Sequence, residues 1–289
     1  EYEQYIAQYE PYSDYGYTSL YVWGRDDDQS VALLNDNIVL SMKDYMSDER
    51  ILSFMGTNKV DETAGELLEF VAKNTDYKSG LYLIPEVTAK CVGDKAITVI
   101  EDVDNHDYIL ATERYIDLQG PSFSHVRRKL ARFDREYGAN AKVGEASLSD
   151  PAVQQSIRML SLKWAFMGTD GSVSAHGEIA AIERSLADIA YLEEGSDIRC
   201  LVLEVDGVIE GFCIYELRPG FATVHFIKTN LALDGSADYM MINTMRQILL
   251  VHGIRKVNHE QDLGIAGLRA AKKHYCPETY LKKYMLQSV

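Results

Sequence analysis

The sequence lacks the long apolar runs and the motifs that mark several common classes of protein. No stretch approaches the roughly 20 uninterrupted apolar residues that a membrane-spanning helix needs. Neither the HExxH pattern of zinc hydrolases nor the glycine-rich P-loop of nucleotide hydrolases is present. These absences argue against an integral membrane protein and against both classes of hydrolase.

Cysteine is scarce. The four cysteines, Cys91, Cys200, Cys213 and Cys276, form no CxxC pair and have no histidine at the spacing of a metal site. We therefore expect reduced thiols and no bound metal. The acidic, tyrosine-rich N-terminal segment lacks the basic and apolar stretches of a secretion signal, so we expect a cytoplasmic protein.

The negative net charge of −15 is confined to the first part of the chain. Residues 1–122 carry 24 acidic and 9 basic side chains, whereas the remaining residues carry 20 of each. An anionic ligand is therefore repelled by the first part and tolerated only in the second. This balance argues against DNA binding and against general adhesion to anionic membranes.

The first part of the chain reads as strands, a helix and further strands. Asn35–Asn37 separates two apolar runs and predicts a hairpin turn. A helix is predicted from Asp61, with Leu67, Phe70 and Val71 facing inward. Strands are predicted at 19–23, 31–34, 38–42, 50–55, 80–84, 96–100 and 107–116, with a turn at 24–28 and a short segment around Lys90 between the later strands.

Gly120-Pro121 interrupts the chain, and we place a domain boundary there, giving domains of residues 1–120 and 121–289. In the second domain, Gly253 marks the C-terminal end of a helix that begins near Ser236. Other helices are predicted at 124–137, 152–164, 178–193 and 264–274, and strands at 198–205, 208–217, 221–229, 255–260 and 280–286.

This order of elements indicates an α/β fold with mixed sheets. A hairpin, a strand, a glycine turn, a helix, a strand, a helix and a final strand follow one another in the core of GNAT-type acyltransferases. The first domain repeats a weaker version of that order. We therefore predict two tandem GNAT-like domains, of which the acidic first one is non-catalytic and the second carries the site.

The segment NHEQDLGIAGLR at residues 258–269 is followed by Lys272, Tyr275 and Pro277. It resembles the motif Asn-Arg-Glu-x-Asp-Leu-Gly-x-x-Gly-Leu-Arg of the phosphatidylglycerol lysyltransferase C-terminal domain family. Residues 108–136 are similar to a second block of that family, an apolar strand, Leu-x-Gly and a basic helix. The resemblance implies a soluble GNAT-fold transferase. It would move an acyl or aminoacyl group from acyl-CoA or aminoacyl-tRNA to an amine or hydroxyl of a small-molecule acceptor, with no covalently bound cofactor.

The sequence departs from this family at two positions. The family strand reads His-x-Glu-Lys-Ala, whereas here it is His225-Phe226-Ile227-Lys228-Thr229. Strand alternation predicts that His225 and Ile227 share a face, so an apolar side chain replaces the expected carboxylate. His259 stands where the family has arginine. These changes leave a second interpretation open, a non-catalytic binding or regulatory module.

The candidate catalytic residues are Glu260, His225 and His259. Glu260 follows a strand and precedes a helix, where its carboxylate could accept a proton or hold a substrate ammonium group. Both histidines could titrate near neutral pH, and both could equally be structural residues of strands.

The candidate donor-binding residues lie around two helix starts. The first backbone N–H groups of the helix near Ser236 suit a pyrophosphate or the 3′ phosphate of a tRNA, although a Gly-Ser pair is also an ordinary helix cap. Asp262 could likewise cap the helix at 264–274. Basic side chains on that helix and at Arg128, Arg132 and Arg135 could guide a polyanion or form a solvated face. The full set is Lys228, Gly235, Ser236, Ala237, Asn258, Asp262, Arg269 and Lys272.

Overall fold

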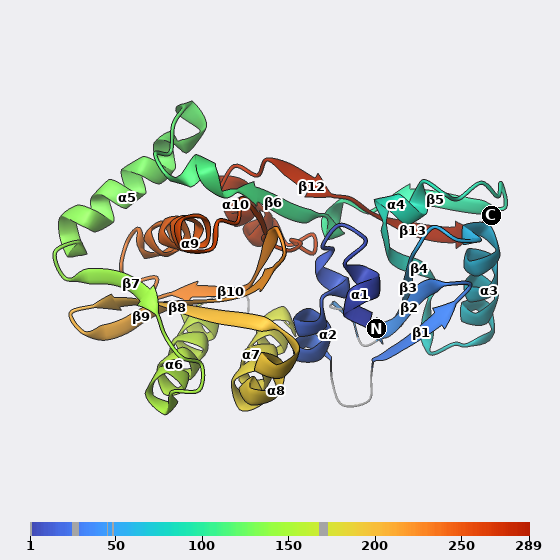
Figure 1. The fold of residues 1–289 in the computed structure, drawn as a ribbon, viewed down its shortest axis with the longest axis horizontal. Coiled ribbons are helices and arrows are strands. Elements are labelled where there is room, and N and C mark those ends of the chain that lie inside the picture. The colour runs from blue at the N-terminus through green and yellow to red at the C-terminus, as the bar shows by residue number, and fades with distance from the viewer. Residues whose placement is uncertain (1, 25–28, 45, 48, 168–172) are drawn as a thin grey trace. The chain divides into compact units, whose positions relative to one another are not determined.

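The computed structural model describes residues 2–24, 29–44, 46–47, 49–167 and 173–289, which form two compact units (Figure 1). Unit 1 comprises Glu1–Asp107, Gln261–Arg269 and Tyr280–Val289. Unit 2 comprises Tyr108–Glu260 and Ala270–Thr279. Each unit contains one sheet with both parallel and antiparallel strand pairs, which confirms the predicted α/β class with mixed sheets.

Unit 1 is built on a six-stranded sheet of order β1-β2-β3-β4-β13-β5. The predicted hairpin is confirmed, since Asn35 and Asp36 adopt φ values of 50° and 60°, the left-handed region that two-residue hairpin turns require. The strands are β1 Ser30–Leu34, β2 Asn37–Lys43, β3 Arg50–Met55, β4 Tyr77–Pro85, β5 Ile97–Glu101 and β13 Lys283–Ser288.

Helix α3, Val60–Lys73, follows β3 and packs on the sheet of unit 1. Its buried face includes Ala64, Leu67, Leu68 and Val71. The prediction that Phe70 faces inward is wrong, because Phe70 lies on the adjacent face, is exposed, and contacts the ring of Tyr77 edge-on. The short helix α4, Glu86–Ala89, occupies the segment before Lys90.

The N-terminal segment of unit 1 is helical. The prediction of a strand at 19–23 is wrong, since these residues belong to α2, Tyr17–Trp23, whose buried residues Thr18, Ser19 and Val22 follow helical spacing. Helix α1, Tyr2–Ile6, and the 3₁₀ turn η1, Ser13–Tyr15, precede it. Residues 25–28 of the predicted turn lie outside the described residues.

Unit 2 is built on a seven-stranded sheet of order β12-β6-β11-β10-β9-β8-β7. The pair β10–β11 is parallel, and β6–β11, β9–β10, β8–β9 and β7–β8 are antiparallel. The strands are β6 Asp107–Ala111, β7 Ala141–Glu145, β8 Asp197–Val205, β9 Val208–Arg218, β10 Phe221–Thr229, β11 Lys256–Asn258 and β12 Thr279–Leu281.

Helices cover both faces of the unit 2 sheet. Figure 1 shows α5 and α9 on one face and α6, α7 and α8 on the other. Helix α5 and the Gly253 end of α9 lie where the sequence predicts them, and Gly253 has φ 69°. The helices are α5 Ser124–Tyr137, α6 Pro151–Met167, α7 Val173–Ala187, α8 Ile189–Gly195, α9 Ser236–His252 and α10 Ala266–His274.

Three features of the second half differ from the predictions. The helix predicted at 178–193 is divided at Asp188 into α7 and α8. Strand β7 was not predicted. The C-terminal strand predicted at 280–286 is divided into β12 and β13, and β13 pairs with β4 and β5 of unit 1. The compact units therefore do not follow a single boundary at residue 120, because pairing with distant strands places the chain end in unit 1.

Candidate active site

A β-bulge in β10 positions the first candidate residue. The β9–β10 register shifts between Val224 and Phe226, so His225 is the extra residue of the bulge. Ile227 therefore packs with Ala222 and Val224 against the core on the α9 side. His225 instead reaches Glu216 on β9. The prediction that His225 and Ile227 share a face is wrong, because a bulge breaks strand alternation.

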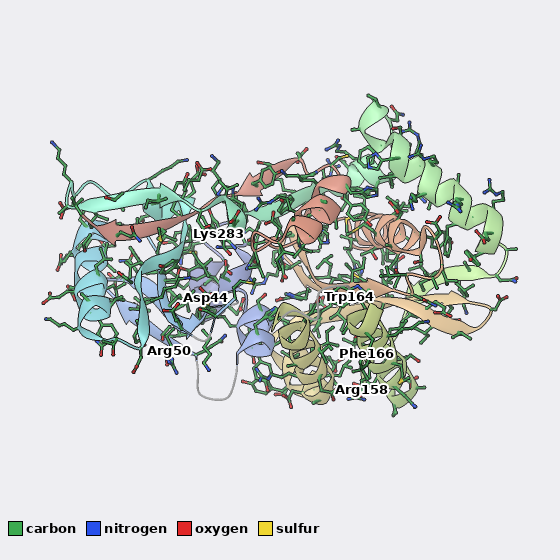
Figure 2. All side chains as sticks on the ribbon, turned by 180° about the vertical axis from the view of Figure 1, so that it is seen from behind. Asp44, Arg50, Arg158, Trp164, Phe166 and Lys283 are labelled. Carbon is green, nitrogen blue, oxygen red and sulfur yellow. The ribbon has the colours of Figure 1, made fainter. Side chains whose placement is uncertain are left out.

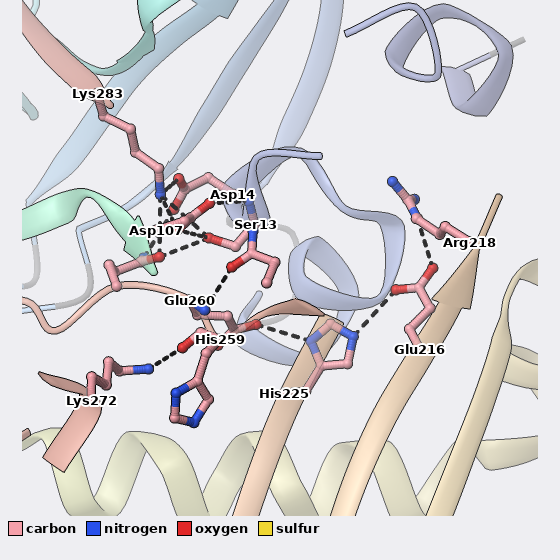
Figure 3. A network of polar contacts seen from close by, with 12 residues as sticks. Ser13, Asp14, Asp107, Glu216, Arg218, His225, His259, Glu260, Lys272 and Lys283 are labelled. Atoms are coloured by element: carbon pink, nitrogen blue, oxygen red, sulfur yellow. Dashed lines mark hydrogen bonds and ion pairs between the residues drawn. The ribbon is translucent and has the colours of Figure 1, made fainter. Parts of the chain in front are cut away.

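His225 lies between two carboxylates in unit 2 (Figure 3). Its Nδ1 is 3.0 Å from Oε1 of Glu260, and its Nε2 is 3.2 Å from Oε2 of Glu216. The Nε of Arg218 donates to the other oxygen of Glu216 at 3.1 Å. We call these four residues the His225 network. The exposed fraction of the side chain is 1% for His225, 4% for Glu216 and 15% for Glu260, so Glu260 has the best access to solvent of these three.

The carboxylates determine the protonation of His225. Burial by itself would lower the pKa of His225, but the hydrogen bonds and negative charges of Glu216 and Glu260 raise it to about 9. Burial by itself would raise the pKa of Glu216, but His225 and Arg218 lower it to about 2. His225 is therefore an imidazolium at neutral pH and donates a hydrogen bond to each carboxylate.

The backbone around Glu260 fixes the direction of its side chain. Glu260 has φ 55°, in the left-handed region that non-glycine residues rarely adopt. Its N–H donates to Oδ1 of the fully buried Asn258 at 2.7 Å, and its carbonyl accepts from the N–H of Tyr108 at 3.1 Å. Asn258, a predicted donor-binding residue, thus shapes the turn that presents the Glu260 carboxylate.

His259 has the opposite environment to His225. It is buried, and Nζ of Lys272 donates a hydrogen bond to its backbone carbonyl. Burial, together with the positive charges of Lys272 and Lys228, holds the pKa of His259 well below its usual range, so the ring is neutral. Among the residues that the structure describes, its buried Nδ1 has no hydrogen-bond partner.

Residues predicted to bind a donor near the start of α9 make contacts within unit 2. Nζ of Lys228 is 2.8 Å from Oε1 of Glu178 and 3.6 Å from the ring centroid of Trp164, which lies on α6 (Figure 2). Ser236 is buried, and its hydroxyl donates to Oγ1 of Thr229 at 2.9 Å. Ala237 is exposed.

Gly235 precedes α9 and meets α5 closely. It has φ 88°, and a Cβ at this position would lie 2.6 Å from the carbonyl oxygen of Lys129. Close packing against α5 therefore explains why glycine is needed at this position, whether or not a phosphate binds there.

Asp262 and Arg269 belong to unit 1 and bind each other. Two guanidinium nitrogens of Arg269 donate to the two oxygens of Asp262 at 2.8 and 2.7 Å. Asp262 also accepts the N–H of Gly264 at 2.9 Å, and Arg269 donates to Oδ1 of Asp104 at 2.5 Å. These contacts agree with the interpretation of Asp262 as a residue that caps the turn before α10.

Sequence reasoning missed Glu216 and Arg218. Their only signal was two charged residues directly after the apolar run Phe212–Tyr215 of β9. It also missed Lys283, whose fully buried ammonium group pairs with Asp14 and Asp107 in unit 1 (Figure 3). Ser13 and Gln261 complete this group, which we call the Lys283 cluster.

The described residues contain neither a membrane-spanning helix nor a metal-binding cluster. No described helix is both long and apolar enough to cross a membrane. No set of three or more described His, Cys, Asp or Glu side chains is arranged to hold a metal ion. All four cysteines are free.

Comparisons with known proteins identify relatives. A family model described as "Phosphatidylglycerol lysyltransferase, C-terminal" matches residues 6–287. Curated protein sequences give no significant match. A conserved protein of unknown function from Bacteroides thetaiotaomicron is similar in structure, with 21% identity, a TM-score of 0.79, and coverage of 96% of this chain and 92% of that chain. L-PGS from Bacillus licheniformis has 14% identity, a TM-score of 0.64, and coverage of 99% and 90%. FemX has 10% identity, a TM-score of 0.54, and coverage of 92% and 86%. These similarities confirm the predicted α/β fold.

Proposed function

The chain belongs to the phosphatidylglycerol lysyltransferase C-terminal family, and on this premise we propose that it is an acyl- or aminoacyltransferase with its active site in unit 2. An amine or hydroxyl of the acceptor attacks the carbonyl carbon of the donor. A new bond forms to that carbon, and the bond from it to the donor's oxygen or sulfur breaks. The proton of the nucleophile passes to Glu260, which then gives it to the leaving oxygen or sulfur.

The observation that carries the proposal is the buried imidazolium of His225 between two carboxylates. Its N–H groups occupy one oxygen of Glu260 and one of Glu216. Because Glu260 is better exposed than His225, Glu260 is the group that meets the substrate. His225 acts through Glu260 and is a positioning residue. Ile227 stands where the family has a glutamate. In this chain Glu260 of the His225 network supplies the carboxylate instead.

We favour an aminoacyl ester of tRNA as the donor over a CoA thioester. The family name and the similarity to L-PGS support this choice. The surface of α5 also supports it, because Arg128 and Arg135 are exposed on this helix. Lys129 and Arg132 of the same helix both pair with Asp234, so they contribute less positive charge. Exposed arginines on a helix suit a nucleic acid backbone.

A binding or regulatory module is the second candidate. It is favoured by the contacts of Lys228 and Ser236, which satisfy these side chains within the protein. A chain of this kind would bind a donor or acceptor without transferring a group.

The test is a transfer assay with the full chain. Radiolabelled aminoacyl-tRNA and acetyl-CoA are each incubated with a panel of amines, hydroxyl compounds and lipid extracts. We expect transfer from aminoacyl-tRNA, and a loss of about 10²-fold or more in kcat for Glu260→Gln, the range typical of a general base. Glu193→Gln, at an exposed site on α8, is the matched control and should retain full activity. Ligand binding without turnover on any donor would support the second candidate instead.

A further inference from the structure

His259 is a buried polar side chain whose Nδ1 makes no hydrogen bond within the described part of the chain. It follows β11, and 7% of the residue is exposed. Burying such a group without a partner costs about 1–3 kcal/mol. A buried polar group in this state needs an explanation, and a ligand that supplies the missing partner is one.

His259 lies at the end of the parallel pairing between β10 and β11 in unit 2. The β10–β11 pairing covers only Phe221–Thr223 and Lys256–Asn258. His259 comes directly after Asn258, the last paired residue of β11, and His225 comes two residues after Thr223, the last residue of β10 that pairs with β11. The two histidines therefore both lie just beyond the end of this parallel pairing.

The surroundings of His259 favour a ligand atom that carries negative charge. Lys272 holds the His259 backbone, and its ammonium group and that of Lys228 impose a positive potential on the ring. The ring also lies 6.2 Å from that of Tyr275, edge to face. A neutral imidazole still has one N–H to donate. In a positive potential, a hydrogen bond from this N–H to an oxyanion is favourable.

We propose that His259 is a catalytic residue that donates a hydrogen bond to the carbonyl oxygen of the transferred acyl or aminoacyl group. This inference rests on the proposed function. When the nucleophile attacks, its lone pair forms the new bond to carbon, and the π electrons of the C=O bond move onto the oxygen. His259 donates to this oxyanion and keeps its proton. When the intermediate collapses, the C=O bond re-forms and the leaving group departs with the electrons of the broken bond.

The first experiment measures kinetics of His259 variants. His259→Ala should lower kcat by about 10²-fold with little change in KM, as loss of one oxyanion donor does in other enzymes. His259→Asn places a donor near the position of Nδ1, and His259→Gln places one near Nε2. We expect one of these two variants to recover at least tenfold in kcat over the alanine variant. An alanine variant with wild-type kcat, or no recovery by either amide, would overturn the proposal.

The control is His252→Asn. His252 lies in the last turn of α9, and its buried Nε2 makes no hydrogen bond in the described part of the chain, although it lies 3.8 Å from Oε1 of Glu145. The His252→Asn variant should retain full activity, because His252 is not part of the proposed site. If His252→Asn lost activity as His259→Ala does, both effects would be structural and the proposal would fail.

The second experiment measures binding and needs no turnover. The imidazole signals of His259 are followed by ¹⁵N NMR while three probes are added: 3′-deoxy-3′-(lysylamino)adenosine, acetyl-CoA and inorganic phosphate. We expect a carbonyl-bearing probe to shift the His259 nitrogens and phosphate to leave them unchanged. A shift with phosphate alone would reassign the residue to phosphate binding and overturn the proposal. Transfer activity that is insensitive to His259 would refute this inference and leave the proposed function intact.

Discussion

Replacing Lys283 with methionine should strongly destabilise unit 1. The side chains of Lys283, Asp14 and Asp107 are all fully buried. Nζ of Lys283 pairs with Asp14 and lies 2.8 Å from Oδ1 of Asp107. Methionine fills most of the volume of the lysine stem but removes the ammonium group. Two buried carboxylates then lose their contacts with the ammonium group of Lys283.

The size of the loss in stability depends on the hydrogen bonds that each carboxylate keeps in the Lys283→Met variant. Asp107 retains the N–H and hydroxyl of Ser13 at 2.8 and 2.7 Å. Asp14 retains the amide of Gln261 at 3.1 Å. These neutral donors do not replace a charge, so we expect a loss of about 3–5 kcal/mol, as is typical when one partner of a buried ion pair is removed. This is a large share of the total stability of an ordinary domain.

The assay uses the tryptophans of the chain as reporters for each unit. Trp23 lies in α2 of unit 1 and Trp164 in α6 of unit 2. In a Trp164→Phe background, urea unfolding followed by fluorescence reports unit 1. Lys73→Met is the matched control, because Lys73 and its partner Glu69 are 69% and 67% exposed, and such pairs contribute less than about 1 kcal/mol. A Lys283→Met variant as stable as this control would refute the reasoning. Adding Asp14→Asn to Lys283→Met should restore part of the lost free energy of unfolding, since it removes one of the two buried negative charges.

Two further predictions concern unit 2. The stabilisation from the His225–Glu216 pair should depend on pH. The raised pKa of His225 gives a contribution to stability that is complete below pH 6.5 and is lost as pH rises through about 9. The lowered pKa of Glu216 gives a contribution that is present above pH 4.5 and is lost as pH falls through about 2. Urea unfolding of the wild-type protein and Glu216→Gln should therefore differ most near pH 5–6 and converge above pH 9, and a constant difference would contradict this. Gly235→Ala should lower the free energy of unfolding by about 1–3 kcal/mol, because the new Cβ would meet the carbonyl of Lys129 at 2.6 Å and the backbone has φ 88°. Gly144→Ala, with open space around its Cβ, is the control, and equal melting temperatures of the two variants would show that α5 yields to the added methyl group.

The sequence predicts the elements whose signals are local. Helix α5 has the predicted bounds because its apolar residues recur with helical spacing, and Gly253 ends α9 through its left-handed φ. The hairpin at Asn35 and Asp36 was likewise readable from two residues that tolerate positive φ. In each of these cases one short segment contains both the pattern and its cause.

The features that sequence reasoning missed depend on distant parts of the chain. Strand β13 has an ordinary strand pattern, and nothing in it indicates that its partners are β4 and β5. Lys283 begins that strand and is buried only because Asp14 and Asp107 converge on it. At the candidate site, Glu260 and both histidines were predicted, whereas Glu216 and the bulge at His225 were not. A bulge changes which face a side chain occupies without leaving a mark in the residue pattern.

The two histidines of unit 2 illustrate why site chemistry needs three-dimensional information. Both are buried, and burial alone would make both neutral. His225 has Glu216 and Glu260 as neighbours and is charged, whereas His259 lies in the field of Lys272 and Lys228 and is neutral. His259 and Glu260 are neighbours in the chain, yet the surroundings of one are cationic and the carboxylate of the other binds the imidazolium of His225. Because a pair of groups with opposite pKa shifts is the usual means of acid–base catalysis at neutral pH, this contrast is a stronger argument for a transferase than any one of the residues alone.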